Sequence, residues 1–312
     1  MKNTVDAAAF YKAMTALLDI PAKSSISALR EIKAEFTADQ CVLSATDLDT
    51  WMSVTIPAGG DSFDFVFRNS ANIQKVCRHF DGTLELDLQQ RGDEAFLTMR
   101  SGGKGGEFHV YDTEDCPTWP EFEVKQTHTA NAAKILACVK QVKYAVNPRA
   151  IKLDYQGVLF QNRHIWAVEG HRAACCDDGG LDIERPFLVG VPALEQLKAF
   201  GNADIQISVA DEWVLFQNKH IHLLTKRILN VTPLTYESVV PQKWSEEFRF
   251  HRKDFVQALK YLLACIGKAD KPYVRFHNGT LSLRVNGCLY KAAVSISAES
   301  SIIFGFDARY ML

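Results

Sequence analysis

One short phrase occurs twice in this sequence in altered form, each time directly after an apolar run. The first copy is Ala45-Thr46-Asp47-Leu48-Asp49-Thr50, after Cys41-Val42-Leu43, and the second is Ala167-Val168-Glu169-Gly170-His171-Arg172, after His164-Ile165-Trp166. Each copy predicts a strand that ends in a small residue, then an acid, then a chain reversal into another strand. The copies lie about 120 residues apart, so we predict one domain type that is used more than once.

The length and composition are those of a protein with several domains. A chain of 312 residues is too long for one ordinary core, so two or three domains are expected. Residues 1–6 lack the apolar core of a signal peptide, and no run approaches the roughly 18 apolar residues of a membrane span. We therefore expect a cytoplasmic protein without a membrane partner. The net charge of −2 argues against a nucleic-acid partner, but an average hides a polarised surface.

The cysteine pattern does not indicate a metal site. The eight cysteines are scattered, and none stands in a C-x-x-C spacing, so we predict neither zinc nor another cofactor. Cys175 and Cys176 are adjacent and could oxidise. We predict instead two reduced thiols on a strand, at least one of them packed as a small hydrophobe.

Helical periodicity recurs between strand-rich stretches. Apolar spacings of three and four predict helices over 5–18, 70–80, 130–146, 192–200 and 252–266. Ser70 is the predicted cap of the second helix, and Pro192 is predicted to lie in a first turn.

Strand patterns fill the segments between these helices. The predicted strands are Cys41–Ser44, Met52–Ile56, Leu84–Leu88, Ala95–Met99, Ile205–Val209, Val214–Gln217 and Leu281–Val285. Asp81-Gly82, Asn218-Lys219 and Asn278-Gly279 are the turn signals between elements. Hairpins with one helix per unit predict α+β domains with antiparallel sheets covered on one face by helices. Polar connectors predict domain boundaries that give 1–125, 126–243 and a shorter 244–312.

Basic residues lie opposite the apolar stripes of four predicted helices. They are Lys12, Lys75, Arg78, Lys140, Lys253 and Lys260. A solvated helix face is often rich in lysine, and this interpretation stays open for any single helix. The same asymmetry on four helices favours a surface that faces a polyanion, which binds phosphate by counterion release without reading sequence.

Several motifs together resemble the β subunit of bacterial DNA polymerase III, the sliding-clamp family. The segment 165–173, Ile165 to Ala173, is similar to the family's V-A-T-D-G-H-R-L stretch, and 43–49 is a weaker copy of it. Asp115-Cys116-Pro117-Thr118-Trp119-Pro120 is similar to D-F-P-x-x-P, and 303–312 is similar to I-G-F-N-x-x-Y-L-L. These matches stand in family order along essentially the whole chain.

The resemblance implies a DNA-clamp fold of three similar domains, with helices on an inner face and antiparallel sheet outside. It implies a head-to-tail homodimer that encircles double-stranded DNA without sequence preference, and a non-catalytic accessory subunit that gives a polymerase its processivity. The basic helix faces would then line the hole. Lys23 and Arg149 fall on loops that contact DNA in the family, each after a proline, Pro21 or Pro148.

The resemblance also implies two protein-binding sites. The cleft that takes short peptides from polymerases and clamp loaders matches Tyr155, Val168, Gly170, His171, Arg172, Ala173, Pro233 and Val239. The ring interface matches Phe108 and Val110 on one side and Cys265 and Ile266 on the other; the alternative for these four is simple core.

This chain also departs from the family pattern. Val168 and Glu169 replace the family's Thr and Asp, and Ala173 replaces a leucine of the cleft, which implies a larger or shallower pocket. The family continues beyond the position that matches Leu312, so we expect an incomplete third domain.

Two other functions remain open. One is a clamp-derived interaction or regulatory protein that forms no ring, such as a decoy or a mobile-element accessory factor. The other is an enzyme that uses His171 with Asp177, Asp178 or Glu169. No glycine-rich phosphate loop, metal-ligand spacing or nucleophile elbow in the sequence supports the enzyme.

Overall fold

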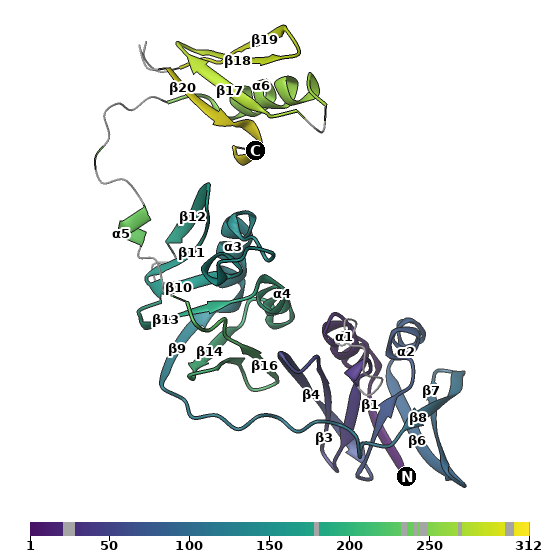
Figure 1. Ribbon diagram of the computed structural model, residues 1–312. Helices are drawn as coiled ribbons and strands as arrows, with labels where there is room; N and C mark the ends of the chain where they lie inside the picture. The colour runs from purple at the N-terminus through teal and green to yellow at the C-terminus, as the bar shows by residue number, and fades with distance from the viewer. Residues whose placement is uncertain are drawn as a thin grey trace. The chain divides into compact units, whose positions relative to one another are not determined.

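The chain forms two compact units, Met1–Pro233 and Leu234–Leu312, in the computed structural model (Figure 1). The structure describes residues 1–20, 29–177, 181–231, 236–239, 243, 249–267, 270–296 and 303–311. The predicted three-domain division stays a prediction. Its first boundary lies inside the first unit, where Gln126 begins a strand.

The N-terminal part of the first unit is an antiparallel sheet covered by two helices that pack side by side (Figure 1). Its elements are β1 (Lys2–Asp6), α1 (Ala7–Leu17), β2 (Lys33–Phe36), β3 (Gln40–Thr46), β4 (Thr50–Gly60), β5 (Phe63–Phe67), α2 (Ser70–Cys77), β6 (Thr83–Arg91), β7 (Glu94–Ser101) and β8 (Lys104–Tyr111). The strand order is β1-β6-β7-β8-β5-β2-β3-β4, and β1 also pairs with β4. The first eight strands are therefore linked in a closed circuit of pairings.

The predicted apolar stripes are the buried faces of the helices. Phe10, Met14 and Leu17 of α1 are fully buried, and Ile73 and Cys77 of α2 join the same core. Burying a side chain of this size contributes about 1.5–3 kcal/mol. This burial orients each helix, so that its polar residues face away from the sheet.

Strand-to-helix junctions in the first unit use one kind of cap. Asp6, Asn69 and Asn131 each accept a hydrogen bond from the backbone N–H three residues on, at 2.8, 3.0 and 3.2 Å. The prediction that Ser70 caps α2 is therefore wrong. Asn69 takes that role, and Ser70 is buried with its hydroxyl accepting from the Ile32 N–H at 2.9 Å.

The second part of the first unit repeats the arrangement of helices on sheet. Its elements are β9 (Gln126–Asn131), α3 (Ala132–Val142), η3 (Lys143–Ala145), η4 (Leu153–Tyr155), β10 (Val158–Asn162), β11 (His164–Glu169), β12 (Arg172–Asp177), β13 (Ile183–Val189), α4 (Val191–Glu195), η5 (Gln196–Phe200), β14 (Asp204–Val209), β15 (Trp213–Gln217) and β16 (Ile221–Lys226). One sheet has the order β12-β11-β10-β13, and α3 packs on β11 and β12. Pro192 lies in the first turn of α4, as predicted.

Pairing of β4 with β16 joins the two parts into one twelve-stranded sheet. The register runs from Ile221 opposite Val54 to Thr225 opposite Thr50. A small cluster of buried side chains covers this junction: Trp51, Ala210, Trp213 and Leu224, with Trp119, Phe122 and Leu215 packed against them. Residues 112–125, which connect the two parts, thus contribute aromatic side chains to the junction they cross.

The second unit has a four-stranded sheet, and helix α6 (Arg252–Ala264) packs on one face of that sheet. Its other elements are α5 (Tyr236–Val239), β17 (Tyr273–His277), β18 (Thr280–Val285), β19 (Cys288–Ala293), β20 (Ile303–Asp307) and η6 (Ala308–Tyr310). The strand order is β19-β18-β17-β20. Phe255, Leu259 and Leu262 of α6 pack with Val274, Phe276, Leu281 and Leu283 of the sheet in a separate core.

Each predicted helix and strand is present as the predicted type of element, but the helices are shorter than predicted. Helix α3 ends at Val142 and continues as the 3-10 turn η3, and α4 has five residues before η5 replaces it. Cys175 and Cys176 lie as thiols on β12, and Cys176 packs against the core. Across the described ranges, no helix is both long and apolar enough to cross a membrane.

Candidate functional site

The helices α1, α2, α3 and α6 each turn a basic face away from their sheets. Lys12 on α1, Lys75 on α2 and Lys140 on α3 are exposed, and so is Arg78, the C-terminal cap of α2. Lys253 and Lys260 on α6 are exposed as well. The structure therefore places all six of the predicted helix cations on solvent-facing surfaces.

These helix faces contain almost no acid. The segments that form α1, α2 and α3 have no aspartate or glutamate, and Asp254 of α6 lies 3.3 Å from His251. Within the described part of the chain, none of the six cations takes part in an ion pair. Lys75 and Lys140 also lie in the last turns of their helices, where the helix dipole favours a cation.

Sequence reasoning missed two further cations on these helices. Lys134 on α3 and Arg252 on α6 are exposed and also have no ion-pair partner among the described residues. Both lie in the first turns of their helices, and the predicted helix ranges did not mark them as exposed cations. Lys143, which follows α3, is different, because its Nζ lies 2.8 Å from Glu195.

The two loop cations are only partly described. Lys23 lies outside the residues that the structure describes. Arg149 is exposed on a turn whose backbone is fixed by Asn147, the side chain of which accepts the Arg149 N–H at 3.1 Å. The turn after Pro148 therefore presents a basic side chain on a defined backbone.

The second copy of the repeated phrase forms a tight hairpin. Strands β11 and β12 pair with Val168 opposite Ala173 and Glu169 opposite Arg172, so Gly170 and His171 make up the exposed two-residue turn. The Arg172 Nε lies 2.8 Å from a Glu169 carboxylate oxygen. Its guanidinium lies 5.4 Å from the centre of the Tyr144 ring, so the arginine is held on both sides.

The predicted cleft residues of the first unit lie in one neighbourhood. The turn η4, which ends at Tyr155, packs against β11, and the Tyr155 carbonyl accepts the Asn147 N–H at 2.8 Å. The Lys152 Nζ lies 5.2 Å from the Tyr155 ring centre. Val239 ends α5 in the second unit, and Pro233 lies outside the described residues. Six of the eight predicted positions are thus gathered around the hairpin.

Exposed apolar side chains surround this hairpin, and sequence reasoning did not find them. Tyr144, Ile151 and Leu153 are all exposed, Ile151 completely. They belong to η3, η4 and the segment between, and η3 and η4 pack on β11 and β12. They were hard to predict because apolar residues do not recur at a regular spacing in this segment. With the half-buried Tyr155 they form a group of apolar side chains on segments that pack beside these strands, and exposed apolar groups are typical of protein-binding sites.

The predicted partners of His171 lie at different places, with Glu169 at the same turn and paired with Arg172. His171 occupies the exposed turn of the hairpin, whereas Asp177 lies at the far end of β12 and Asp178 is outside the described residues. In the described part of the chain, no group of three His, Cys, Asp or Glu side chains could hold a metal ion.

The predicted interface residues occupy a strand and a helix end. Phe108 and Val110 lie on β8, which pairs with β7 along its length but with β5 only at Val110 and Tyr111. Residues 104–109 of β8 therefore have an edge without a strand partner in the described chain. Val110 is core and Phe108 packs against it. Cys265 caps α6, and Ile266 packs against the core of the second unit.

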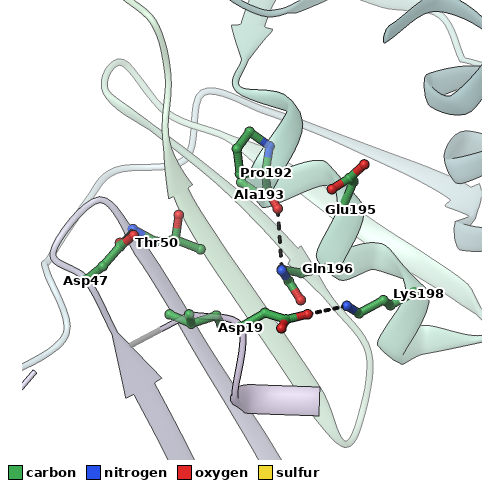
Figure 2. Close-up of a pocket in the computed structure, with 9 residues that line it drawn as sticks. Asp19, Asp47, Thr50, Pro192, Ala193, Glu195, Gln196 and Lys198 are labelled. Atoms are coloured by element: carbon green, nitrogen blue, oxygen red, sulfur yellow. Dashed lines mark hydrogen bonds and ion pairs between the residues drawn. The ribbon is translucent and has the colours of Figure 1, made fainter. Parts of the chain in front are cut away.

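A pocket between the two parts of the first unit was not predicted. Its volume is about 290 Å³, and its lining includes Asp19, Asp47, Glu195, Gln196 and Lys198 (Figure 2). An Asp19–Lys198 ion pair crosses it, and Gln196 donates to the Pro192 carbonyl at 3.5 Å. The ion pair joins Asp19, which follows α1, to Lys198 of η5, and so links the two parts of the first unit.

No protein-family model and no curated protein sequence matches the chain. Solved structures do match its fold. The DNA polymerase III β subunit of Thermotoga maritima matches with a TM-score of 0.83 at 18% identity, over 99% of this chain and 88% of that chain. The sliding clamp of Bacillus subtilis matches with 0.83 at 17% identity, over 100% and 88%. The β sliding clamp of C. crescentus matches with 0.84 at 19% identity, over 100% and 88%.

At these identities the likeness establishes the fold. The chain has the sliding-clamp fold, so the predicted α+β architecture of helices on antiparallel sheet is confirmed.

Proposed function

We propose that this protein is a DNA sliding clamp. It encircles duplex DNA, carries out no reaction of its own, and tethers a replicative polymerase and clamp-loader subunits to their template. The observation that carries the proposal is the match to sliding clamps over essentially the whole chain. It is supported by the exposed cations of α1, α2, α3 and α6, the first three of which contain no acid. A role on replicating DNA would place the protein in the cytoplasm.

Duplex DNA would contact the basic helix faces. Lys12, Lys75, Arg78, Lys140, Lys253 and Lys260, with Lys134 and Arg252, supply cations that no described carboxylate neutralises. Such cations displace condensed counterions from phosphates and read no bases. Binding would therefore be independent of sequence and strongly dependent on salt. Lys23 and Arg149 would add phosphate contacts from loops.

Partner peptides would bind at the β11–β12 hairpin. Tyr144 and Tyr155 lie on turns that pack against its strands, and the Arg172 side chain is fixed between Glu169 and Tyr144. A fixed guanidinium beside exposed aromatic and aliphatic groups suits a short peptide with apolar side chains and an acidic or carbonyl oxygen. Val168, Gly170, His171 and Ala173 complete the part of the proposed site that lies in the first unit.

The peptide site is tested with peptides from the polymerase and clamp-loader subunits. Ala173→Arg places a long cation on the exposed hairpin, and we expect peptide affinity to fall at least tenfold by fluorescence anisotropy. Ala264→Arg, at an exposed position on α6, is the matched control and should bind normally. Equal affinity for both variants would exclude the hairpin as the peptide site.

The ring would form from two chains joined head to tail. The open edge of β8 at residues 104–109, which includes Phe108 and adjoins the buried Val110, would meet the helix end that carries Cys265 and Ile266 in a second copy. Sedimentation equilibrium measures this directly, and we expect a species of twice 35.0 kDa. A monomer at all concentrations would overturn the ring and favour a clamp-derived interaction protein that does not enclose DNA.

A further inference from the structure

The outer face of the second unit's sheet carries a concentrated positive charge. Strand alternation places Arg275 and His277 of β17, Arg284 of β18 and Lys291 of β19 on the face opposite the core. The intervening Val274, Phe276, Leu281 and Leu283 are buried against α6. All four basic residues are exposed, so this basic face looks away from the helix.

The register brings these cations close together. Arg275 is opposite Ser282, which is opposite Lys291, so one row crosses three strands. Arg284 is opposite Leu289 in the next row. With strands about 4.8 Å apart, Arg275 and Lys291 are separated by about 10 Å at the backbone. The same residues line a hollow of about 700 Å³ together with Tyr273, His277 and Thr280.

No described carboxylate neutralises this face. None of Arg275, Arg284 and Lys291 forms an ion pair with a described residue. The acid nearest in register is Asp307 of β20, opposite Tyr273, and its carboxylate already accepts the Arg309 N–H at 2.9 Å. The sheet of the first unit differs, because Arg91 there is paired with Glu107 through bonds of 2.9 and 2.6 Å. Arg275, Arg284 and Lys291 thus form a group of cations whose charges remain available to an anionic ligand.

The polar and aromatic groups on the face narrow the choice of ligand. Tyr273 is 63% exposed and lies at one end of the hollow, beside the Arg284 row, and Leu289 is 47% exposed. Thr280 and Asn278 add a hydroxyl and an amide to the lining, and Ser282, between Arg275 and Lys291, donates its hydroxyl to the Arg275 carbonyl at 3.4 Å. A shallow basic surface with an exposed aromatic ring is the arrangement that binds single strands, since bases stack on the ring while phosphates meet the cations.

We propose that this outer sheet face binds single-stranded DNA. The phosphates would contact Arg275, Arg284 and Lys291, and a base would stack on Tyr273. From Tyr273 to His277 the strand extends about 14 Å, so the phosphate contacts would run along the length of β17. This site is on the side of the sheet opposite α6, and it stands whether or not the chain encircles duplex DNA.

The test uses the full chain and a fluorescent oligothymidylate. The triple variant R275A/R284A/K291A should lose at least tenfold in affinity, and its salt dependence should fall by about 2 in slope, at about 0.7 per lost phosphate contact. The matched control is R163A/K219A, which removes two exposed cations from turns of the first unit and should bind the oligonucleotide normally. Circular dichroism of each variant checks that the second unit remains folded.

A second pair of variants tests the stacking contact. Tyr273→Ala should weaken oligothymidylate binding about fivefold or more, and Tyr273→Phe should retain it, because stacking needs the ring and not the hydroxyl. The proposal is overturned if the triple variant binds within twofold of the parent, or if R163A/K219A loses as much affinity. Tighter binding to phosphatidylserine vesicles than to the oligonucleotide would instead assign the face to anionic lipid.

Discussion

Lys226, the last residue of β16, holds Asp49 by two bonds. Its Nζ lies 2.8 Å from the Asp49 Oδ1, and its backbone N–H donates to the Asp49 carbonyl at 2.8 Å. The two residues are 177 positions apart in the sequence. This contact fixes the turn of the first repeated phrase to the end of the strand that joins the two parts of the first unit.

The side-chain pair at this junction should matter less than the buried strand behind it. Both side chains of the Asp49–Lys226 pair are largely exposed, so Asp49→Asn should cost about 1 kcal/mol or less. Leu223 of β16 is fully buried, and Leu223→Ala should cost about 2–5 kcal/mol. Urea unfolding followed by tryptophan fluorescence measures both. A larger loss for Asp49→Asn than for Leu223→Ala would contradict the description of the junction.

The connecting segment 112–125 should be held down by its tryptophan. The Trp119 ring lies 5.8 Å from that of Trp51 and packs on the cluster over the β4–β16 junction. Trp119→Ala should therefore release the segment and speed its cleavage in limited proteolysis severalfold. Trp119→Phe, which keeps an aromatic ring, is the control and should stay close to the parent. Equal cleavage of all three proteins would show that the ring does not anchor the segment.

Each lysine on the helices should contribute about one phosphate contact to the binding of duplex DNA. Removing a single phosphate contact lowers the slope of log K against log salt by about 0.9 for duplex DNA. Lys12→Gln and Lys140→Gln should each produce a change of about that size in filter binding. Lys219→Gln, at an exposed turn between β15 and β16, is the matched control and should leave the slope unchanged. A slope lowered by Lys219→Gln and not by the helix variants would place DNA on another surface.

Thiol labelling should distinguish buried from exposed cysteines. Burial raises the pKa of the Cys77 thiol from 9.0 to about 12, so at about pH 8 it has almost no thiolate in the folded chain. The unfolded chain gives up this proton near pH 9, so folding weakens as pH rises from about 9 towards 12. Mass spectrometry after iodoacetamide treatment should find Cys288, which is exposed, labelled first. Labelling of Cys77 in native protein at a similar rate would contradict the burial.

Local sequence patterns predicted the helices and strands well, because buried side chains recur at one spacing in a helix and at another in a strand. Phe10 and Ile73 were placed on buried helix faces from spacing alone, and both are buried. The β4–β16 pairing could not be predicted in this way, since the contact between Ile221 and Val54 leaves no local trace in either strand. The error at Ser70 has a local cause, because Asn69 and Ser70 are both good capping residues and only the burial of Ser70 decides between them.

The candidate sites were predicted unevenly for the same reason. The period of a helix determines which residues lie opposite its buried face, so the exposure of Lys12 and Lys260 could be predicted. The hairpin around Gly170 followed from the repeated phrase. The Asp19–Lys198 pocket depends on how two distant segments meet, and nothing near either residue indicates it. The basic outer face of the second unit was present in the alternation of Leu281 to Val285, but its charge is evident only once β17, β18 and β19 are aligned.

The central claim is that the protein holds DNA by enclosing it. The direct measurement loads the protein on a nicked circular plasmid with a bacterial clamp loader and ATP, then isolates the complex by gel filtration in high salt, where surface contacts are screened. We predict that the protein stays with the circle and is lost when a restriction enzyme linearises it. Release from the circle and the linear DNA at the same rate would contradict enclosure.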